Sequence, residues 1–105
     1  MTNIDYQKVA TNIINRLGDV HRLRVVSEAT DLFQVQEDCG GISFKFKGSR
    51  KTNHVKIVLN DTDTYTVTFY KNSARKFNKV SVYEFVSANR LANLFEKETG
   101  LSLFL

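Results

Sequence analysis

The sequence lacks several residue types that would shape its fold or its compartment. Its 105 residues include no Trp, no Pro and a single Cys. Because Pro is absent, slow isomerisation of an X–Pro bond cannot limit folding. A single cysteine cannot form an internal disulfide, and a reducing cytosol is the simplest compartment for such a chain.

Long apolar segments are also missing. No apolar run reaches the roughly 18 residues of a membrane-spanning helix, so none is predicted. The first residues, MTNIDYQKVA, lack the basic and then apolar pattern of a secretory signal. The remaining composition is typical of a globular protein, with 42% apolar and 25% charged residues and with eight Phe and four Tyr to fill a core. The length predicts one domain over residues 1–105.

The first predicted element is a helix near the N-terminus. Apolar side chains recur there with the period of one helix face, at Tyr6, Val9, Ala10, Ile13, Ile14 and Leu17. Thr2 or Asn3 can cap its start, and Asp5 places a negative charge near the helix N-terminus. Gly18 can end the helix in the left-handed conformation.

Alternation of apolar and polar residues then predicts a series of short strands. They cover residues 21–28, 32–37, 42–47, 54–59, 64–71 and 77–85. The side chains predicted to point inward from the middle strands are Ile42, Phe44, Phe46, Val55, Ile57, Leu59, Tyr65, Val67 and Phe69. In the last strand, Val80 and Val82 are predicted to point inward as well. Short turns between the runs favour antiparallel neighbours in a meander.

A second helix is predicted from about Ser87 to Thr99, with Ser87 as its cap and Gly100 as its stop. The apolar tail, residues 101–105, is expected to dock on the core or on a second subunit. The elements together predict an α+β domain, in which a mainly antiparallel meander sheet of about five or six strands lies between an N-terminal and a C-terminal helix. Both helices would cover one face of the sheet, and water would cover the other.

Positive charge is concentrated in the middle of the chain. Residues 45–79 hold nine Lys or Arg and two Asp, whereas the rest of the chain holds six basic and nine acidic residues. Alternate turns of a meander lie at the same end of its sheet, so the loops around 48–53 and 72–76 should together form one basic edge. The residues predicted to bind a partner there are Lys45, Lys47, Arg50, Lys51, Lys56, Tyr70, Arg75 and Lys76.

This basic surface has more than one interpretation. It can hold phosphates through counterion release, and His54, Tyr70 and Phe77 could stack on bases. Equally, solvated strand faces are often rich in Lys and Thr, and Lys at a sheet edge prevents aggregation. Because no nucleic-acid-binding motif is present, the sequence leaves open a nucleic acid, a protein partner and a merely solvated face.

Catalytic and metal-binding signatures are weak. Cys39 lies in a DCGG turn and would need a neighbouring His, from His21 or His54, to act as a nucleophile, while the adjacent Asp38 disfavours its thiolate. One Cys and two His give no ligand spacing typical of a metal site. We therefore predict a protein without enzymatic activity, cofactor or bound metal.

A group of acidic residues lies near the second and third predicted strands. It consists of Glu28, Asp31, Glu37 and Asp38. These carboxylates could bind a hard cation or pair with the basic edge, although acids near turns are most often simply hydrated.

Two segments of the second half carry a family pattern. Asp63, Thr64, Tyr65, Val67 and Phe69 have the form D-T-Y-x-V-x-F, and Leu91, Phe95, Thr99, Gly100 and Leu101 have the form L-x-x-x-F-x-x-x-T-G-L. With the basic loop before them, they make residues 48–105 similar to the ending of many small bacteriophage proteins. The chain departs from the pattern at Ala88 or Asn89, where a Tyr is usual, and at Ser102, which replaces a final Tyr.

The resemblance implies a phage or prophage origin and a place in the host cytoplasm. It also implies an accessory protein that binds, and inhibits or modulates, a host or anti-phage-defence protein, here through the basic sheet face and loops. One alternative is a nucleic-acid-binding protein that uses the same surface. Another is a homo-oligomeric structural or assembly component, with a homodimer formed through Leu101, Leu103, Phe104 and Leu105.

Overall fold

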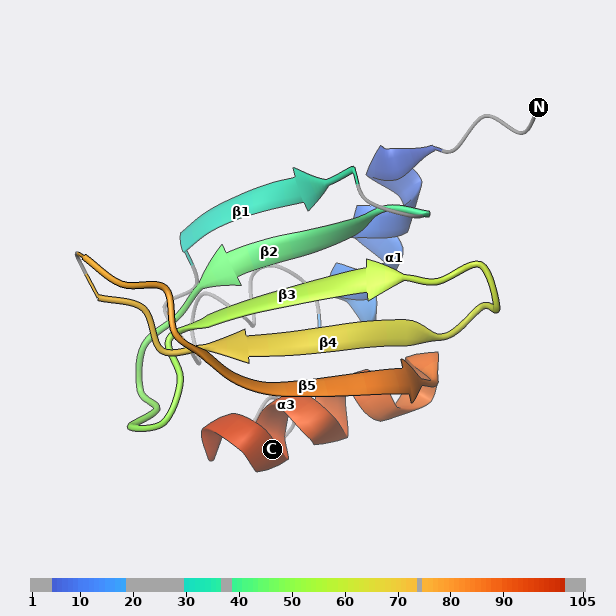
Figure 1. Ribbon diagram of the computed structural model, residues 1–105. Helices are drawn as coiled ribbons and strands as arrows, with labels where there is room; N and C mark the ends of the chain where they lie inside the picture. Colours follow the sequence, from blue (N-terminus) through green and yellow to red (C-terminus); the bar gives the residue numbers. More distant parts are fainter. Residues whose placement is uncertain (1–4, 19–29, 37–38, 74, 102–105) are drawn as a thin grey trace.

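The computed structural model describes residues 5–18, 30–36, 39–73 and 75–101. Its elements are α1 (Tyr6–Arg16), β1 (Thr30–Val35), β2 (Gly41–Lys45), β3 (His54–Leu59), β4 (Tyr65–Tyr70), β5 (Lys79–Val86), the 3-10 turn η1 (Ala88–Arg90) and α3 (Leu91–Thr99) (Figure 1). The α+β class and the order helix, strands, helix are confirmed. The strand predicted over residues 21–28 lies outside the described residues.

The five strands form one antiparallel meander in the order β1-β2-β3-β4-β5. The centre of the sheet is regular, and β3 pairs with β4 from His54 opposite Tyr70 to Leu59 opposite Tyr65. On the other side of β3, Lys45 of β2 lies opposite His54. These two registers align Lys45, His54 and Tyr70 in one row across the sheet, at the end where β2 and β4 finish.

The core lies on one face of the sheet, under both helices (Figure 1). Phe44, Ile57 and Phe69 are at most 1% exposed, which confirms the predicted alternation in the middle strands. The ring of Phe95, from α3, lies 6.0 Å from Phe44 and 6.5 Å from Phe69 between centroids. From α1, Ile13 and Leu17 join the same buried cluster. The alternating pattern therefore buries one side of the sheet by bringing both helices onto it.

Local signals fix the ends of the helices. At the start of α1, the side chain of Asp5 accepts a hydrogen bond from the backbone N–H of Lys8 at 3.1 Å, so Asp5 is the cap of this helix. The predicted caps Thr2 and Asn3 lie outside the described residues. Gly18 and Gly100 have φ angles of 93° and 77°, as predicted for glycines that end a helix.

Ser87 takes the N-cap position of the C-terminal helical segment, as predicted, but its side chain makes no capping hydrogen bond. Ser87 does precede the helical region, but a 3-10 turn comes before α3. Its hydroxyl lies 2.8 Å from the side-chain oxygen of Asn89 and bonds no backbone N–H at the helix start. A serine hydroxyl bonds equally well to a near side chain, and the tight turn brings Asn89 within its reach.

The last strand also differs from its prediction. Val80 and Val82 are 45% and 43% exposed, so they do not point into the core. The register pairs Ser81 with Phe69 and Tyr83 with Val67, which places Ser81 and Tyr83 on the helix-covered face instead. There, both hydroxyls donate hydrogen bonds of 2.7 Å to the carboxylate of Glu98 in α3. The inner side of β5 is therefore polar because α3 presents a carboxylate to it.

Two glycines, one at the start of β2 and one in the loop after it, lie very close to other parts of the chain. A Cβ atom at Gly41 would overlap the backbone oxygen of Ile57, so only glycine allows β2 and β3 to pair this closely. In the loop, a Cβ atom at Gly48 would lie 2.9 Å from the side chain of Leu101. Leu101 packs against the core, as predicted for the tail. Leu103, Phe104 and Leu105 lie outside the described residues.

Candidate functional site

The two basic loops lie at the same end of the sheet, as predicted. Residues 46–53 join β2 to β3, residues 71–78 join β4 to β5, and both connections are at the left of Figure 1. Eight exposed cations gather there, and we call this region the basic end. They are Lys45, Lys47, Arg50, Lys51, Lys71, Arg75, Lys76 and Lys79. No Asp or Glu occurs in residues 41–60 or 64–83, so no carboxylate of these segments offsets this charge.

Asparagine side chains hold the two loops together. The Asn53 amide donates to the backbone oxygen of Asn72 at 2.7 Å, and the Asn53 side-chain oxygen accepts from the backbone N–H of Asn72 at 2.8 Å. The side-chain oxygen of Asn72 in turn accepts from the backbone N–H of Asn78 at 3.2 Å. Because the loops are tied by these bonds, the basic end presents its cations on a defined backbone.

Within the first loop, Ser49 organises a tight turn. Its hydroxyl accepts from the backbone N–H groups of Lys51 and Thr52, at 3.3 and 3.4 Å. Thr52 is fully buried, whereas Arg50 and Lys51 are exposed. The turn thus anchors the loop through one residue and directs two cations into water.

A groove of about 530 Å³ runs between the loops. Lys45, Lys47, His54 and Asn53 line one side, and Asn72, Ser73 and Phe77 line the other. Phe77 is 86% exposed, which is unusual for a side chain of this size. The groove therefore combines cations, amide groups and one exposed aromatic ring, a mixture that suits an acidic ligand surface.

The remaining predicted site residues lie on the open face beside the groove. Tyr70 is half-buried, and its ring meets the ring of His54 edge to face at a centroid distance of 5.6 Å. Lys56 lies one row further from the loops, in register with Ser43 and Thr68. The structure thus brings the eight predicted site residues to one end of the sheet, and the three that lie in strands, Lys45, Lys56 and Tyr70, share its open face, with Lys56 furthest from the loops.

The apolar residues of β5 were missed as surface residues. Val80, Val82 and Phe85 are exposed, and Phe85 is 70% exposed. With Phe77 in the loop just before β5, they place large exposed apolar side chains at intervals from residue 77 to residue 85. The sequence carried one signal of this, because both alternating sets of side chains in residues 80–85 contain apolar members: Val80 and Val82 in one set, Tyr83 and Phe85 in the other. The prediction that the two valines are buried was wrong.

The opposite end of the sheet has the opposite charge. The turn between β3 and β4 carries Asp61 and Asp63, and Glu84 lies near the end of β5; all three are exposed. We call this region the acidic end. Burial raises the pKa of the neighbouring Tyr65 above its ordinary value, and the charge of Asp63 adds to that effect while Arg16 opposes it.

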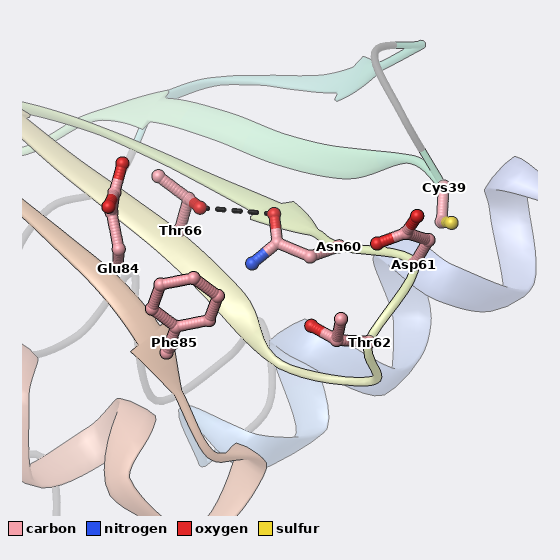
Figure 2. A pocket seen from close by; sticks show the side chains of 7 residues that line it. All are labelled: Cys39, Asn60, Asp61, Thr62, Thr66, Glu84 and Phe85. Carbon is pink, nitrogen blue, oxygen red and sulfur yellow. Dashed lines mark hydrogen bonds between the residues drawn. The ribbon is translucent and has the colours of Figure 1, made fainter.

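A cavity of about 420 Å³ lies at the acidic end, between the β3–β4 turn and β5 (Figure 2). Two of its polar side chains bond each other, since Thr66 donates to the side-chain oxygen of Asn60 at 3.0 Å. The Asn60 amide also donates to the neighbouring Thr64 at 3.3 Å. Cys39 lies at one edge and Phe85 at another (Figure 2). The internal bonds show that Asn60 and Thr66 shape the turn.

Cys39 and His54 cannot form a catalytic pair in this arrangement. The backbone N–H of Cys39 donates to Leu59, the last residue of β3, whereas His54 is the first residue of that strand. At the rise of a β-strand, these positions are about 16 Å apart. The other candidate partner, His21, lies outside the described residues.

The possible cation site at the predicted acidic group is not assembled within the described residues. Glu28, Glu37 and Asp38 lie outside them, and the structure describes only the backbone of Asp31. Where side chains are described, no group of three or more His, Cys, Asp or Glu residues is placed to hold a metal ion.

Comparisons with protein-family models, curated proteins and solved structures found no match to this chain. Among the described residues, no helix has both the length and the apolar character needed to cross a membrane.

Proposed function

We propose that the chain is a non-enzymatic binding protein whose basic end docks on an acidic surface of another protein. The observation that carries this proposal is the set of eight exposed cations at one end of the sheet, where a groove is lined by two of them and by an exposed phenylalanine. Cations arranged in this way accelerate encounter with a negatively charged partner and orient it.

The exposed apolar residues favour a protein over other polyanions. Protein interfaces are enriched in aromatic and Arg residues at their centre and have a polar rim. Phe77 lies against the groove, with Arg75 and Lys76 directly before it, and the exposed valines of β5 follow within a few residues. Phe77 is thus the expected anchor, and the loop cations form the rim.

The family resemblance supplies a class of partner. Small phage accessory proteins of this pattern imply a host or anti-phage-defence protein that is bound and inhibited. The charge of the basic end is complementary to an acidic site on such a protein. The partner would be met in the bacterial cytoplasm.

A second candidate function is binding of single-stranded nucleic acid in the same groove. The edge-to-face rings of His54 and Tyr70, together with exposed Phe77, could stack on bases beside a row of cations. Counterion release would then make the affinity for an oligonucleotide fall steeply as salt increases.

Charge-neutralising variants test the proposal. Arg50→Gln with Lys51→Gln removes two cations from the basic end, and Lys8→Gln with Arg16→Gln removes the same two residue types from α1, where both are exposed. In affinity capture from nuclease-treated lysate of phage-infected bacteria, the unchanged chain and the α1 variant should retain one protein. The loop variant should lose it, with affinity for the purified protein reduced by about tenfold or more.

A Phe77→Ala variant separates anchoring from steering. Because Phe77 is exposed, its removal should leave the fold intact while it weakens binding of the captured protein by about tenfold or more. Capture that is unaffected by both the loop and Phe77 variants would contradict the proposal. Two results together would instead support the nucleic-acid function: loss of the captured protein on nuclease treatment, and an affinity for a labelled oligonucleotide that falls steeply as salt increases.

A further inference from the structure

β5 is the last strand of the described sheet and therefore an edge strand within it. It is the longest of the described strands, with eight residues, and β4 is its single strand neighbour among the described residues. Natural edge strands usually carry charges rather than apolar groups on the exposed face. Here the exposed face carries Val80 and Val82, with Phe85 beside them.

A groove of about 400 Å³ follows this edge between β5 and α3. Its lining includes the apolar residues Val82, Phe85 and Leu94, and the cations Arg90 and Lys97 of the C-terminal helical segment. The α3 helix lies next to β5 (Figure 1), and residues of both elements line the groove. An added strand would contact both the edge and α3 in this space.

Charge changes sign along β5. The strand starts at the basic end with Lys79 and reaches Glu84 beside the acidic end, where Asp61 lines the same cavity as Glu84 (Figure 2). Consider a second strand that, like β5, has a cation near its start and a carboxylate near its end. If this strand ran antiparallel to β5, each cation would lie near a carboxylate of the other strand. β5 of a second copy of the chain has this distribution of charge.

We propose that β5 pairs antiparallel with β5 of a second copy of this chain, about a two-fold axis at Val82. A two-fold axis perpendicular to the sheet leaves the same face of both copies on the same side. Paired residues must then point to the same face, so the axis passes between one residue and the same residue of the second copy. With Val82 there, it lies opposite Val82 of the second copy, and Val80 lies opposite Glu84. Lys79 then lies opposite Phe85 of the second copy, one position from Glu84. Because the irregular register pairs Lys79 with Tyr70, its side chain is on the same open face as Val82 and Glu84, and this long side chain can reach Glu84 of the second copy.

The same arrangement places the basic end of each copy beside the acidic end of the other. A parallel arrangement of the two strands would instead bring Lys79 against Lys79 and the two basic ends together, which like charges disfavour. Irregular register next to Lys79 and again near Phe85 limits the regular part of the ladder to the residues between them. The pairing is consequently short, and the exposed valines and Phe85 supply its apolar contacts.

Sedimentation of the full chain tests this pairing directly. The unchanged chain should form a dimer at concentrations of about 100 µM or below. Lys79→Glu and Glu84→Lys should each weaken the dimer by about tenfold or more, because each places like charges across the two-fold axis. An equimolar mixture of the two variants should recover the dimer, since the carboxylate introduced at position 79 of one chain then faces the ammonium group introduced at position 84 of the other.

Recovery on mixing cannot result from a folding defect, and circular dichroism of each variant checks its fold. A chain that stays monomeric at about 100 µM overturns the proposal. So does a mixture that fails to recover the dimer. A dimer that survives both single substitutions also overturns it and favours the apolar tail, residues 101–105, as the interface. The test uses no other protein, so its result is independent of the proposed partner binding, and the Arg50→Gln, Lys51→Gln variant should dimerise normally.

Discussion

β4 and β5 are neighbours in one sheet, yet apolar side chains are buried in β4 and exposed in β5. In β4, Val67 and Phe69 are 2% and 0% exposed. In β5, Val82 is 43% exposed, while the polar side chain of Ser81 faces the helices opposite Phe69. The central strand β4 thus buries its apolar side chains, whereas the edge strand β5 exposes two of its valines.

The cause of the difference lies in a pairing irregularity. Phe69 is paired with Ser81, but the next residue, Tyr70, is paired with Lys79 rather than with Val80. The extra residue changes the side to which the following positions point. Glu98 of α3 then accepts hydrogen bonds from the hydroxyls that this change turns inward.

The largest effect is expected from a matched pair of phenylalanine truncations. Phe69→Ala removes a fully buried ring at the centre of the core and should lower the free energy of unfolding by about 3–5 kcal/mol. Phe77→Ala removes a ring of the same size from the surface and should change it by less than about 0.5 kcal/mol. Urea unfolding followed by circular dichroism measures both.

A similar loss of stability in the two variants would contradict the prediction that Phe69 is buried and Phe77 exposed in solution. A large loss for Phe77→Ala would mean that this ring is covered by other groups of the chain, and its proposed role as an anchor for a partner would fall with it. The unchanged slope of the unfolding curve checks that both variants still unfold in one step.

A smaller effect is expected from the same substitution placed in each strand. Val67→Thr puts a hydroxyl into the core and should cost about 2 kcal/mol, because the buried hydroxyl loses its water partners. Val82→Thr places the hydroxyl in water and should cost less than about 0.5 kcal/mol in dilute solution. A cost at Val82 that grows with protein concentration would belong to the proposed dimer and not to the fold.

The contrast between the regular central strands and the irregular edge strand β5 also explains which features could be predicted from the sequence. The alternation in residues 42–47, 54–59 and 64–71 predicted the buried side correctly, because regular pairing keeps a period of two. The meeting of the basic loops also followed from meander topology alone. Such features depend on regular local geometry, which periodicity reports.

The features that sequence missed depend on contacts between distant residues. The irregular pairing beside Lys79 has no local signature, and the carboxylate of Glu98 reaches β5 only through the packing of α3. The groove between the loops likewise depends on the bonds between Asn53 and Asn72, nineteen residues apart. Charge composition could predict a basic edge, but it could not predict that Phe77 would lie exposed beside it.

A still smaller effect concerns the polar inner side of β5, where Tyr83 donates to Glu98 at 2.7 Å. Tyr83→Phe should lower the free energy of unfolding by about 1 kcal/mol, since the pair is only partly buried. The Glu98→Gln variant and the double variant complete a cycle, measured by urea unfolding. A coupling near zero would show that the bond contributes nothing.

The smallest effect is the pH dependence of the same bond. The hydrogen bond to Glu98, together with desolvation, raises the pKa of Tyr83 above its ordinary value of 10.0. Its stabilisation is therefore complete below about pH 10 and decreases as the pH rises through the raised value, because the unfolded chain loses this proton first. As the pH is raised above 10, the free energy of unfolding should thus decrease less for Tyr83→Phe than for the unchanged chain. Part of the decrease should remain in both chains, because Tyr65 also has a raised pKa. Identical alkaline slopes for the two chains would mean that the Tyr83 proton is not held by Glu98.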